Sequence, residues 1–480
     1  MRNGRTKRAY VIGSGPNGLA AAIVLAQAGL RVEVFEAEAE PGGAARSLPL
    51  TLPGFLHDFG SAVYPFAAGS PFFNTLPLAD YGLEWIHGSA PLAHPLDDGT
   101  AVVIERDLAR AKEALGADAE PWRELVEPAA LHWQQFSGDA LGPALRVPSH
   151  PLLLARFGMH AVRPAEWIAR RRFSNPRTRA LFAGLAGHSF LSFDQLVSGP
   201  VGALFAATLH AVGWPIPRGG ARALPHALIG YLESLGGTLH LWQRIGTSQF
   251  QELAGDGSLL LCDLAPRALA SMAGDRISEG FRRAANRFRH APGAFKIDYA
   301  LSEPVPWRAP ECRRAITLHL GGTFEEIAAS EEAVTQGRCA ERPFVLVAQP
   351  TLFDPARAPH GKHILWAYGH VPNGSSFDMS ERIESQIERF APGFRDCVLA
   401  RHVMPPDELE RMDSNLVGGD ISGGALTLAQ MLFRPSFGAY STGAPNIYLC
   451  SASTPPGGGV HGMCGYYAAR LALRQIGVKG

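Results

Sequence analysis

A glycine-rich turn between two apolar runs constrains the fold of this chain more than any other feature. Residues 10–18 read YVIGSGPNG, an apolar run continues to Leu25, and Glu36 closes the next apolar run. This order is typical of a strand, a glycine turn, a helix and a second strand that together bind a dinucleotide. The sequence therefore predicts an α/β protein with a Rossmann-like domain at its amino end.

Each glycine of the motif has its own task. Gly13 allows a tight turn after the strand, Gly15 leaves room where the backbone approaches a pyrophosphate, and Gly18 lets the helix pack closely on the sheet. The start of the helix presents unpaired N–H groups and a partial positive charge to the phosphates. The dinucleotide-binding residues expected from this part of the chain are Gly13, Gly15, Pro16, Asn17, Gly18, Glu36 and Ala37.

The residues after Glu36 indicate which dinucleotide is bound. Gly42 and Gly43 form a second glycine pair, and Arg46 follows shortly after it. A nicotinamide site has no need of this second loop, whereas FAD requires one that closes over its pyrophosphate. Arg46 would supply a fixed cationic fork for that charge. The alternative is an arginine solvated at the surface.

Two further segments resemble a known family. Residues 55–61 read FLHDFGS, and residues 446–470 contain the run PPGGGVHGMCGYY. Both resemble the phytoene-desaturase-like flavoproteins of the amine-oxidase superfamily, and within them the branch of the pyridine nucleotide-disulfide oxidoreductase domain-containing proteins. Segments 415–421 and 434–437 look like the same branch. The resemblance covers nearly the whole chain and is weaker between about 105 and 210.

The resemblance implies a division into two domains. A Rossmann-like FAD-binding domain would be assembled from the discontinuous segments 1–70, 215–285 and 415–480. An α+β substrate domain with a helical subdomain would comprise 71–214 and 286–414. The resemblance also implies that the final loop and helix close on the flavin. It adds to the expected FAD contacts Gly60, Ser61, Ile245, Ser453, Gly459, Val460 and Met463.

Lys296 is the candidate catalytic residue. It lies early in segment 295–301, whose alternating pattern predicts a strand. In amine oxidases a lysine in the corresponding strand holds a water against flavin N5, where positive charge favours oxygen reduction. The alternatives are an exposed strand lysine, or one paired with Asp298 on the same face. We expect the substrate pocket between this strand and the helical segment of about 105–214.

Four histidines are weaker candidates for a catalytic base, because their spacing in the sequence identifies no paired base. They are His57, His188, His210 and His461. Isolated histidines are more often satisfied structural groups than general bases. Asp378 and Glu381 are expected to form a capping box before an amphipathic helix.

Three functions fit these patterns. The first is an FAD-dependent oxidoreductase that takes a hydride from a C–C bond of a lipophilic, isoprenoid- or carotenoid-like substrate and passes electrons to oxygen or a quinone. The second is a flavin amine oxidase. The third is a non-catalytic binding protein for prenylated or lipid ligands, against which the intact glycine motifs argue.

Composition excludes several other classes. Lys plus Arg and Asp plus Glu both number 44, so a nucleic-acid partner is not expected. The six cysteines contain no CxxC pair, which leaves disulfide exchange without a basis and is typical of reduced thiols in the cytoplasm. No metal site and no spanning helix are indicated, although a peripheral membrane contact is compatible with a lipophilic substrate. The sequence leaves the oligomeric state open.

Overall fold

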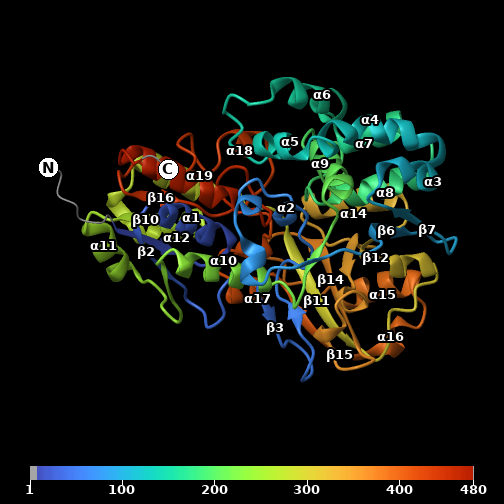
Figure 1. Ribbon diagram of the computed structural model, residues 1–480. Coiled ribbons are helices and arrows are strands. Elements are labelled where there is room, and N and C mark those ends of the chain that lie inside the picture. The colour runs from blue at the N-terminus through green and yellow to red at the C-terminus, as the bar shows by residue number, and fades with distance from the viewer. Residues whose placement is uncertain (1–7, 479–480) are drawn as a thin grey trace.

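The structure, a computed structural model, describes residues 8–478 and contains two large sheets. Figure 1 shows the first sheet on the left, with the blue, yellow-green and red parts of the chain together. The second sheet lies on the right, below a layer of teal and green helices. The expected α/β fold class, with a Rossmann-like part, is confirmed, whereas the exact domain boundaries stay a prediction.

The first sheet is parallel and draws its strands from three distant stretches of the chain. Its strand order is β16-β10-β1-β2-β9. The strands are β1 (Arg8–Ile12), β2 (Arg31–Phe35), β9 (Thr238–His240), β10 (Leu259–Cys262) and β16 (Ile447–Leu449). Strands β10, β1 and β2 are the inner ones. Strands β1 and β10 read as nearly continuous apolar runs, because a parallel sheet is covered on both faces.

Helices cover both faces of this sheet. One face packs against α1 (Pro16–Gln27), α10 (Ala223–Ser234) and α19 (Met463–Gln475). The other packs against α11 (Thr247–Gly255), α12 (Pro266–Ala273) and α13 (Glu279–Arg287). The first and last of these helices along the chain, α1 and α19, lie against each other. The amino and carboxyl parts of the described chain thus build one layer together.

The second sheet is mixed, with the order β15-β11-β14-β13-β12-β6-β7. Its strands are β6 (Ala90–Pro95), β7 (Ala101–Ile104), β11 (Gly293–Leu301), β12 (Ala315–Leu320), β13 (Val345–Ala348), β14 (His363–Val371) and β15 (Val398–Met404). Only the pair β6 and β12 is parallel. Helix α15 (Ser380–Phe390) packs on one face of the sheet, where Ile383, Ile387 and Phe390 join its core.

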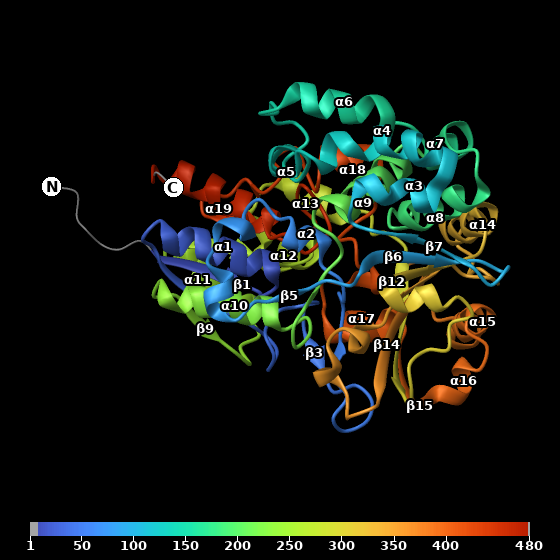
Figure 2. The same ribbon diagram turned by 45° about the vertical axis from the view of Figure 1, so that its right-hand side comes forward.

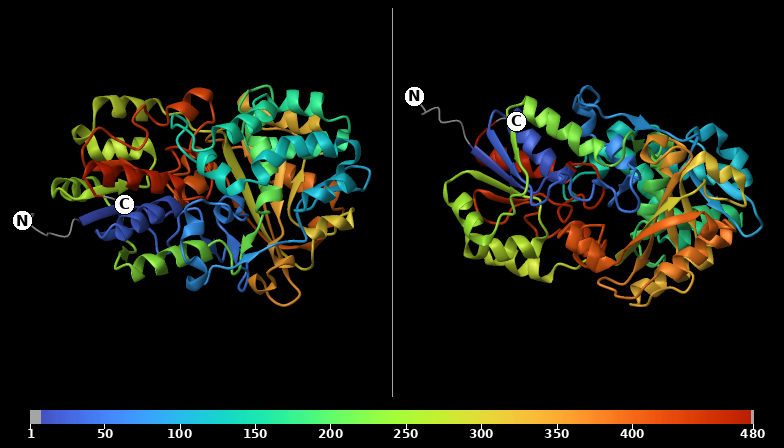
Figure 3. Two further views of the ribbon diagram at one scale, coloured as in Figure 1. Left: turned by 45° about the horizontal axis from the view of Figure 1, so that its top comes forward. Right: turned by 90° about the horizontal axis from the view of Figure 1, so that it is seen from below.

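A group of helices covers the opposite face, as the two views of Figure 3 show. It consists of α3 (Ala111–Leu115), α4 (Ala119–Ala130), α5 (Trp133–Ala140), α6 (Pro151–Ala161), α7 (Ala165–Arg172), α8 (Pro176–Gly187) and α9 (Ser198–Ala211). Helix α8 contacts strands β6 and β12 and also α14 (Phe324–Thr335). Among residues 8–478, no helix is long and apolar enough to cross a membrane.

Short elements connect these layers. They are β3 (Ser47–Leu48), β4 (His57–Asp58), β5 (Trp85–Ile86), β8 (Ile216–Pro217), α2 (Pro65–Ala68), α16 (Phe394–Cys397), α17 (Pro406–Met412) and α18 (Leu428–Leu432). Strands β3 and β4 form a small hairpin that lies beside β14, between the two large sheets.

The expected capping box before α15 is wrong. Asp378 does accept a hydrogen bond from the amide of Ser380 at 2.8 Å, but Glu381 hydrogen-bonds Ser385 and Arg395 instead of the preceding backbone. A capping box occurs at α14, where Thr323 and Glu326 satisfy each other's backbone amides.

Candidate dinucleotide-binding site

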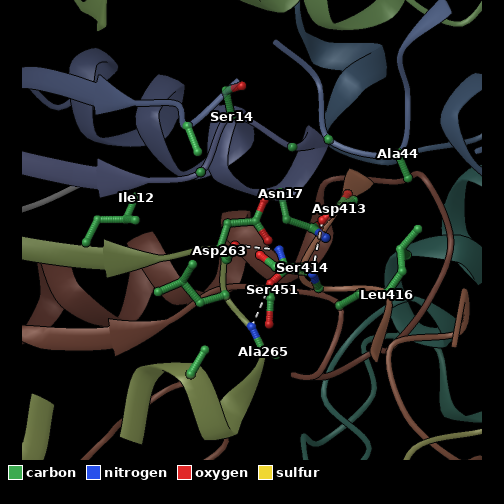
Figure 4. A pocket seen from close by; sticks show the side chains of 18 of the residues that line it. Ile12, Ser14, Asn17, Ala44, Asp263, Ala265, Asp413, Ser414, Leu416 and Ser451 are labelled. Carbon is green, nitrogen blue, oxygen red and sulfur yellow. Dashed lines mark hydrogen bonds between the residues drawn. The ribbon is translucent and has the colours of Figure 1, made fainter. Parts of the chain in front are cut away.

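A cavity of about 340 Å³ lies beyond the carboxyl ends of the parallel strands β1, β2 and β10. In an open parallel sheet this edge is where ligands bind. Segments 12–17, 35–38, 243–245, 263–265, 411–416, 451–453 and 459–460 contribute to its wall. Figure 4 shows that the side chains meeting there come from strands and loops far apart in the sequence.

The β1–α1 turn follows the geometry that the glycines require. Gly13 has φ +97°, a conformation that L side chains rarely adopt. A Cβ on Gly15 would lie 2.7 Å from the Asp263 carboxylate, and one on Gly18 would lie 2.1 Å from the Gly13 carbonyl oxygen. Helix α1 begins at Pro16, and its N-cap residue, Gly15, has no side chain to cap it. The first residues of the helix line the cavity, so the positive end of the helix dipole faces it.

Glu36 is buried at the end of β2 and joins both glycine turns. One carboxylate oxygen accepts hydrogen bonds from the amide and hydroxyl of Ser14, at 3.0 and 2.5 Å. The other accepts from the amide of Glu38 at 3.0 Å. The Ser14 hydroxyl in turn accepts from the amide of Gly42 at 3.1 Å. Glu36 thus fixes the entrance of the cavity as well as lining it.

Arg46 is buried, so the alternative of a solvated surface arginine is wrong. Its Nε donates to the Gly43 carbonyl at 2.8 Å and its Nη2 to the Met412 carbonyl at 2.7 Å. The guanidinium also lies 4.7 Å from the centre of the Phe59 ring. These contacts hold a permanent positive charge in the wall of the cavity.

Several acidic residues that we did not predict also line this cavity, among them Asp263 and Asp413. Asp263 follows β10 and accepts a hydrogen bond from the amide of Gly18 at 2.9 Å. Burial, with smaller contributions from the nearby charges of Asp413 and Glu36, raises the pKa of Asp263 to about 7. Burial also raises the pKa of Asp413. An acidic residue directly after a parallel strand was the available signal for Asp263.

Asn17, in the first turn of α1, carries an unsatisfied polar group. It is buried, and its Oδ1 has no hydrogen-bond partner among the described residues. Figure 4 shows this side chain at the cavity beside Asp263. A buried amide without a partner is costly in a folded protein, and a bound ligand with polar atoms would relieve that cost.

The structure brings most of the expected dinucleotide residues to this cavity. Those that line it are Gly13, Gly15, Pro16, Asn17, Glu36, Ala37, Gly43, Arg46, Ile245, Ser453, Gly459 and Val460. Gly18 and Gly42 lie directly behind the wall in the two turns. Ser453, Gly459 and Val460 come from the loop between β16 and α19, so the carboxyl part of the chain closes the site.

Three expected residues do not line the cavity, and two of them support its wall from behind. The amides of Gly60 and Ser61 both donate to the carbonyl of Ala44, which lines the cavity, at 3.1 and 3.2 Å. Met463 is the first residue of α19 and is buried. It borders a different surface hollow, between α5 and α19.

Lys296 does not line the cavity, and it is not an exposed strand lysine. It is buried on β11, and its ammonium forms an ion pair with Asp298 on the same face, one of the alternatives that the sequence left open. Burial lowers the pKa of Lys296 and raises that of Asp298 to about 6. The ammonium lies 5.8 Å from the centre of the Trp366 ring, whose Nε1 donates to the Gly60 carbonyl at 3.2 Å. Lys296 is therefore connected to the cavity wall only indirectly, through Trp366 and Gly60 to the cavity-lining Ala44.

The four histidines lie in packing contacts. His57 Nδ1 lies 3.7 Å from Asp298 Oδ1, and burial lowers the pKa of His57 to about 3. His188 stacks on Phe205 and its Nε2 lies 3.0 Å from that of His319. His210 Nε2 accepts a hydrogen bond from Trp122, and His461 Nδ1 accepts one from the Met463 amide. His57 Nδ1 and His461 Nε2 are buried and have no hydrogen-bond partner among the described residues.

The region expected to hold the substrate is an aromatic interface. The face of β11 and β14 that carries Lys296 also carries Trp366 and Tyr368. Phe66 contacts both the cavity-lining Gly459 and Phe205 of α9. Aromatic side chains thus run from the cavity to the helices above the second sheet.

Comparisons with known proteins agree with this geometry. Residues 11–81 match the family model "NAD(P)-binding Rossmann-like domain". The chain is 26% identical to pyridine nucleotide-disulfide oxidoreductase domain-containing protein 2 of Mus musculus, over 99% of this chain and 95% of that protein. It is 26% identical to a phytoene dehydrogenase of Streptomyces griseus, over 87% of this chain and 81% of that protein.

Solved structures show the same fold over the whole chain. An oxidoreductase from Methanosarcina mazei superposes with a TM-score of 0.64 at 17% identity, covering 97% of this chain and all of that one. Putrescine oxidase bound to putrescine superposes with a TM-score of 0.60 at 15% identity, covering 98% of this chain and 99% of that one. The chain is thus a homologue of the phytoene desaturases and of pyridine nucleotide-disulfide oxidoreductase domain-containing protein 2, and it shares its fold with putrescine oxidase.

Proposed function

We propose that this protein is an FAD-dependent oxidoreductase that desaturates a C–C bond of a lipophilic substrate, in which one carbon gives up a hydride to the flavin and the neighbouring carbon loses a proton to water. The observation that carries the proposal is the two-part cavity, in which Gly43 of the second turn approaches Gly15 of the first. An ideal Cβ on Gly43 would lie 3.3 Å from the Gly15 Cα. A second loop packed against the phosphate-binding turn is what distinguishes an FAD site from a simple nicotinamide site.

The residues present fit FAD. The N-terminus of α1 and the buried Arg46 would hold the pyrophosphate, and Glu36 would accept hydrogen bonds from the ribose hydroxyls. The unpartnered amide oxygen end of Asn17 supplies a further polar contact. Ile245 would pack beside the adenine, and the loop with Gly459 would face the ring. The phytoene desaturase and amine oxidase families are flavoproteins, which supports this choice.

When bound, FAD supplies two-electron chemistry and accepts the hydride. The chain itself orients the cofactor through Glu36 and Arg46, and its aromatic interface excludes water from the reacting bond. Lys296 would hold a positive charge behind the flavin ring, and Asp298 would balance that charge. Electrons would then pass to oxygen or a quinone.

A lipophilic, isoprenoid- or carotenoid-like substrate is supported by the phytoene dehydrogenase and desaturase relatives. The apolar contacts of Phe66 with Phe205 of α9, and of Phe205 with Trp214, provide a wall of suitable chemistry. An amine oxidase remains the second candidate, and its support is the fold shared with putrescine oxidase.

The test begins with the purified protein. Heat or acid should release a yellow flavin that migrates as FAD, at one per chain. A protein that stays colourless after incubation with FAD would overturn the proposal and favour a binding protein. Extracts from cells with and without the protein should then be compared by mass spectrometry. Anaerobic bleaching by an accumulating alkene precursor supports C–C dehydrogenation, whereas bleaching only by an amine would replace it with amine oxidation.

A further inference from the structure

We propose that helix α6 and its flanking loops dock on the surface of an anionic lipid bilayer. We call this region the α6 surface and define it by its exposed apolar and basic residues: Leu145, Val147, Leu152, Met159, Val162, Arg156, Arg163 and Arg171. The inference goes beyond the proposed function, because binding to lipid can be measured without cofactor or substrate.

The α6 surface exposes large apolar side chains that a soluble surface would not need. Val147 is 87% exposed, Leu152 is 85% exposed and Met159 is 70% exposed. Leu152 and Met159 lie seven residues apart on α6 and so share one face of the helix. Several exposed apolar residues on one element form a patch, and such patches mark interaction sites.

The opposite face of α6 is also apolar. Phe157 and Ala161 are buried, and Leu153 and Leu154 pack against the same core, which α6 shares with α4. A helix that is apolar on both sides is normally covered on both sides. The protein covers only the inner side of α6, so the apolar side chains on its outer side are left to contact another apolar partner.

Charge identifies that phase as a bilayer with anionic head groups. Between Leu145 and Arg172 the sequence contains six arginines and one glutamate, although the whole chain has equal numbers of basic and acidic residues. Arg156, Arg163 and Arg171 are exposed and make no ion pair within residues 8–478. Apolar side chains flanked by unpaired arginines are the pattern of a helix that lies in a membrane interface.

A second copy of the chain fits this surface less well. In a two-fold dimer the same patch meets itself, so two patches that both carry unpaired arginines would be brought together. Trp167 gives a further indication of a lipid boundary, because it is partly exposed and the Arg163 guanidinium lies 5.6 Å from its ring centre. Aromatic rings and long basic side chains favour the boundary between water and lipid.

The α6 surface is also accessible in shape. Figures 1 and 2 both show α6 at the upper edge of the molecule, beyond the other helices. Strand β15 lies at the opposite, lower edge in the same views. A flat bilayer can therefore approach α6 without meeting either large sheet.

The experiment is co-sedimentation of the full chain with two kinds of vesicle, one of phosphatidylcholine alone and one of equal parts phosphatidylcholine and phosphatidylglycerol. We expect binding to the anionic vesicles that falls as salt is raised, since part of the attraction is electrostatic. The double variant Val147→Glu/Leu152→Glu should lower the bound fraction by about tenfold or more, and Arg156→Glu/Arg163→Glu by a similar factor. Leu399→Glu, at an exposed apolar position on β15, is the matched control and should bind as the wild type does.

Hydrogen exchange on the wild type gives a second measurement that needs no variant. Anionic vesicles should protect residues 145–163 and leave β15 unchanged. The proposal is overturned if the wild type does not bind anionic vesicles. It is equally overturned if the protein alone is a dimer whose interface protects residues 145–163, or if both double variants bind like the wild type.

Discussion

The carboxylate of Asp263 accepts a hydrogen bond from the amide of Gly18, with 2.9 Å between Oδ2 and the nitrogen. This bond joins the end of β10 to the first turn of α1, where the phosphates of a dinucleotide are expected. A carboxylate at this position competes with a bound phosphate unless it is protonated. Its raised pKa, about 7, places that protonation within the physiological range.

We predict that FAD affinity falls as pH rises through about 7. The anionic pyrophosphate should raise the pKa of Asp263 further, so binding takes up a proton and is weaker where the carboxylate is ionised. Each unit of that rise corresponds to about tenfold weaker binding at high pH. Asp263→Asn should flatten the pH profile of the FAD dissociation constant, measured by fluorescence quenching.

Asp263 should also make the free energy of unfolding depend on pH. Because the pKa in the folded protein lies above the ordinary 3.8, the free energy of unfolding should fall as pH rises from that value to about 7. Asp263→Asn should remove this component, while Asp275→Asn, at an exposed carboxylate, should not. An unchanged profile in Asp263→Asn would show that Asp263 titrates normally.

Glu36→Ala should weaken FAD binding by about 1.5–3 kcal/mol, the usual cost of losing a hydrogen bond to a charged group. The change removes the expected ribose contact and also the bonds that hold Ser14. Glu33→Ala is the matched control, because Glu33 lies on the same strand but pairs with Arg31 and His240 outside the cavity. Equal FAD affinity in Glu36→Ala and the wild type would remove Glu36 from the site.

Lys296→Met should have two separable effects. It leaves the buried Asp298 without its partner, which should destabilise the fold by about 3–5 kcal/mol. If Lys296 also supports oxygen reduction, reoxidation of the reduced enzyme should slow by about 100-fold or more. The stability is measured by denaturant unfolding and the reoxidation by stopped flow.

The double variant Lys296→Met/Asp298→Asn separates the two effects. It should recover much of the stability, because no uncompensated charge remains, yet reoxidise as slowly as the single variant. Recovery of both properties would make Lys296 a purely structural residue.

Maleimide labelling of the native protein should modify Cys339 alone. The structure describes all six cysteines as free, and only Cys339 is not buried. Burial raises the pKa of the Cys464 thiol to about 11, although that residue lies in the loop that closes the cavity. Mass spectrometry should find one label in the native protein and none in Cys339→Ser. Rapid native labelling of Cys464 would contradict its burial.

The local parts of the fold and site could be predicted from the sequence. The turn with Gly13 and Gly15 and the strand with Lys296 follow from glycine chemistry and alternation, which act over a few residues. Asp263 escaped prediction because its partner, Gly18, is 245 residues away. The capping box at Thr323 was missed although its signal is local, a threonine followed three residues later by Glu326.

Lys296 shows how far the sequence leads. Its strand and its face could be predicted, and pairing with Asp298 was one alternative. Whether Lys296 is exposed or buried depends on what covers its face of β11. The β3–β4 hairpin covers that face, and it lies more than 200 residues earlier in the chain.

The contact between α1 and α19 has a consequence for the order of events during synthesis. A Cβ on Gly465 would lie 1.8 Å from the carbonyl oxygen of Asn17, so the last described helix packs directly against the turn that opens the cavity. A growing chain emerges from the ribosome amino end first, at about 5–20 residues per second. The glycine motif is therefore among the first segments made, but the wall of the cavity is complete only after α19 has been synthesised. A chain released early would carry the whole motif and still be unable to hold a cofactor, so cofactor retention reports that translation has reached α19.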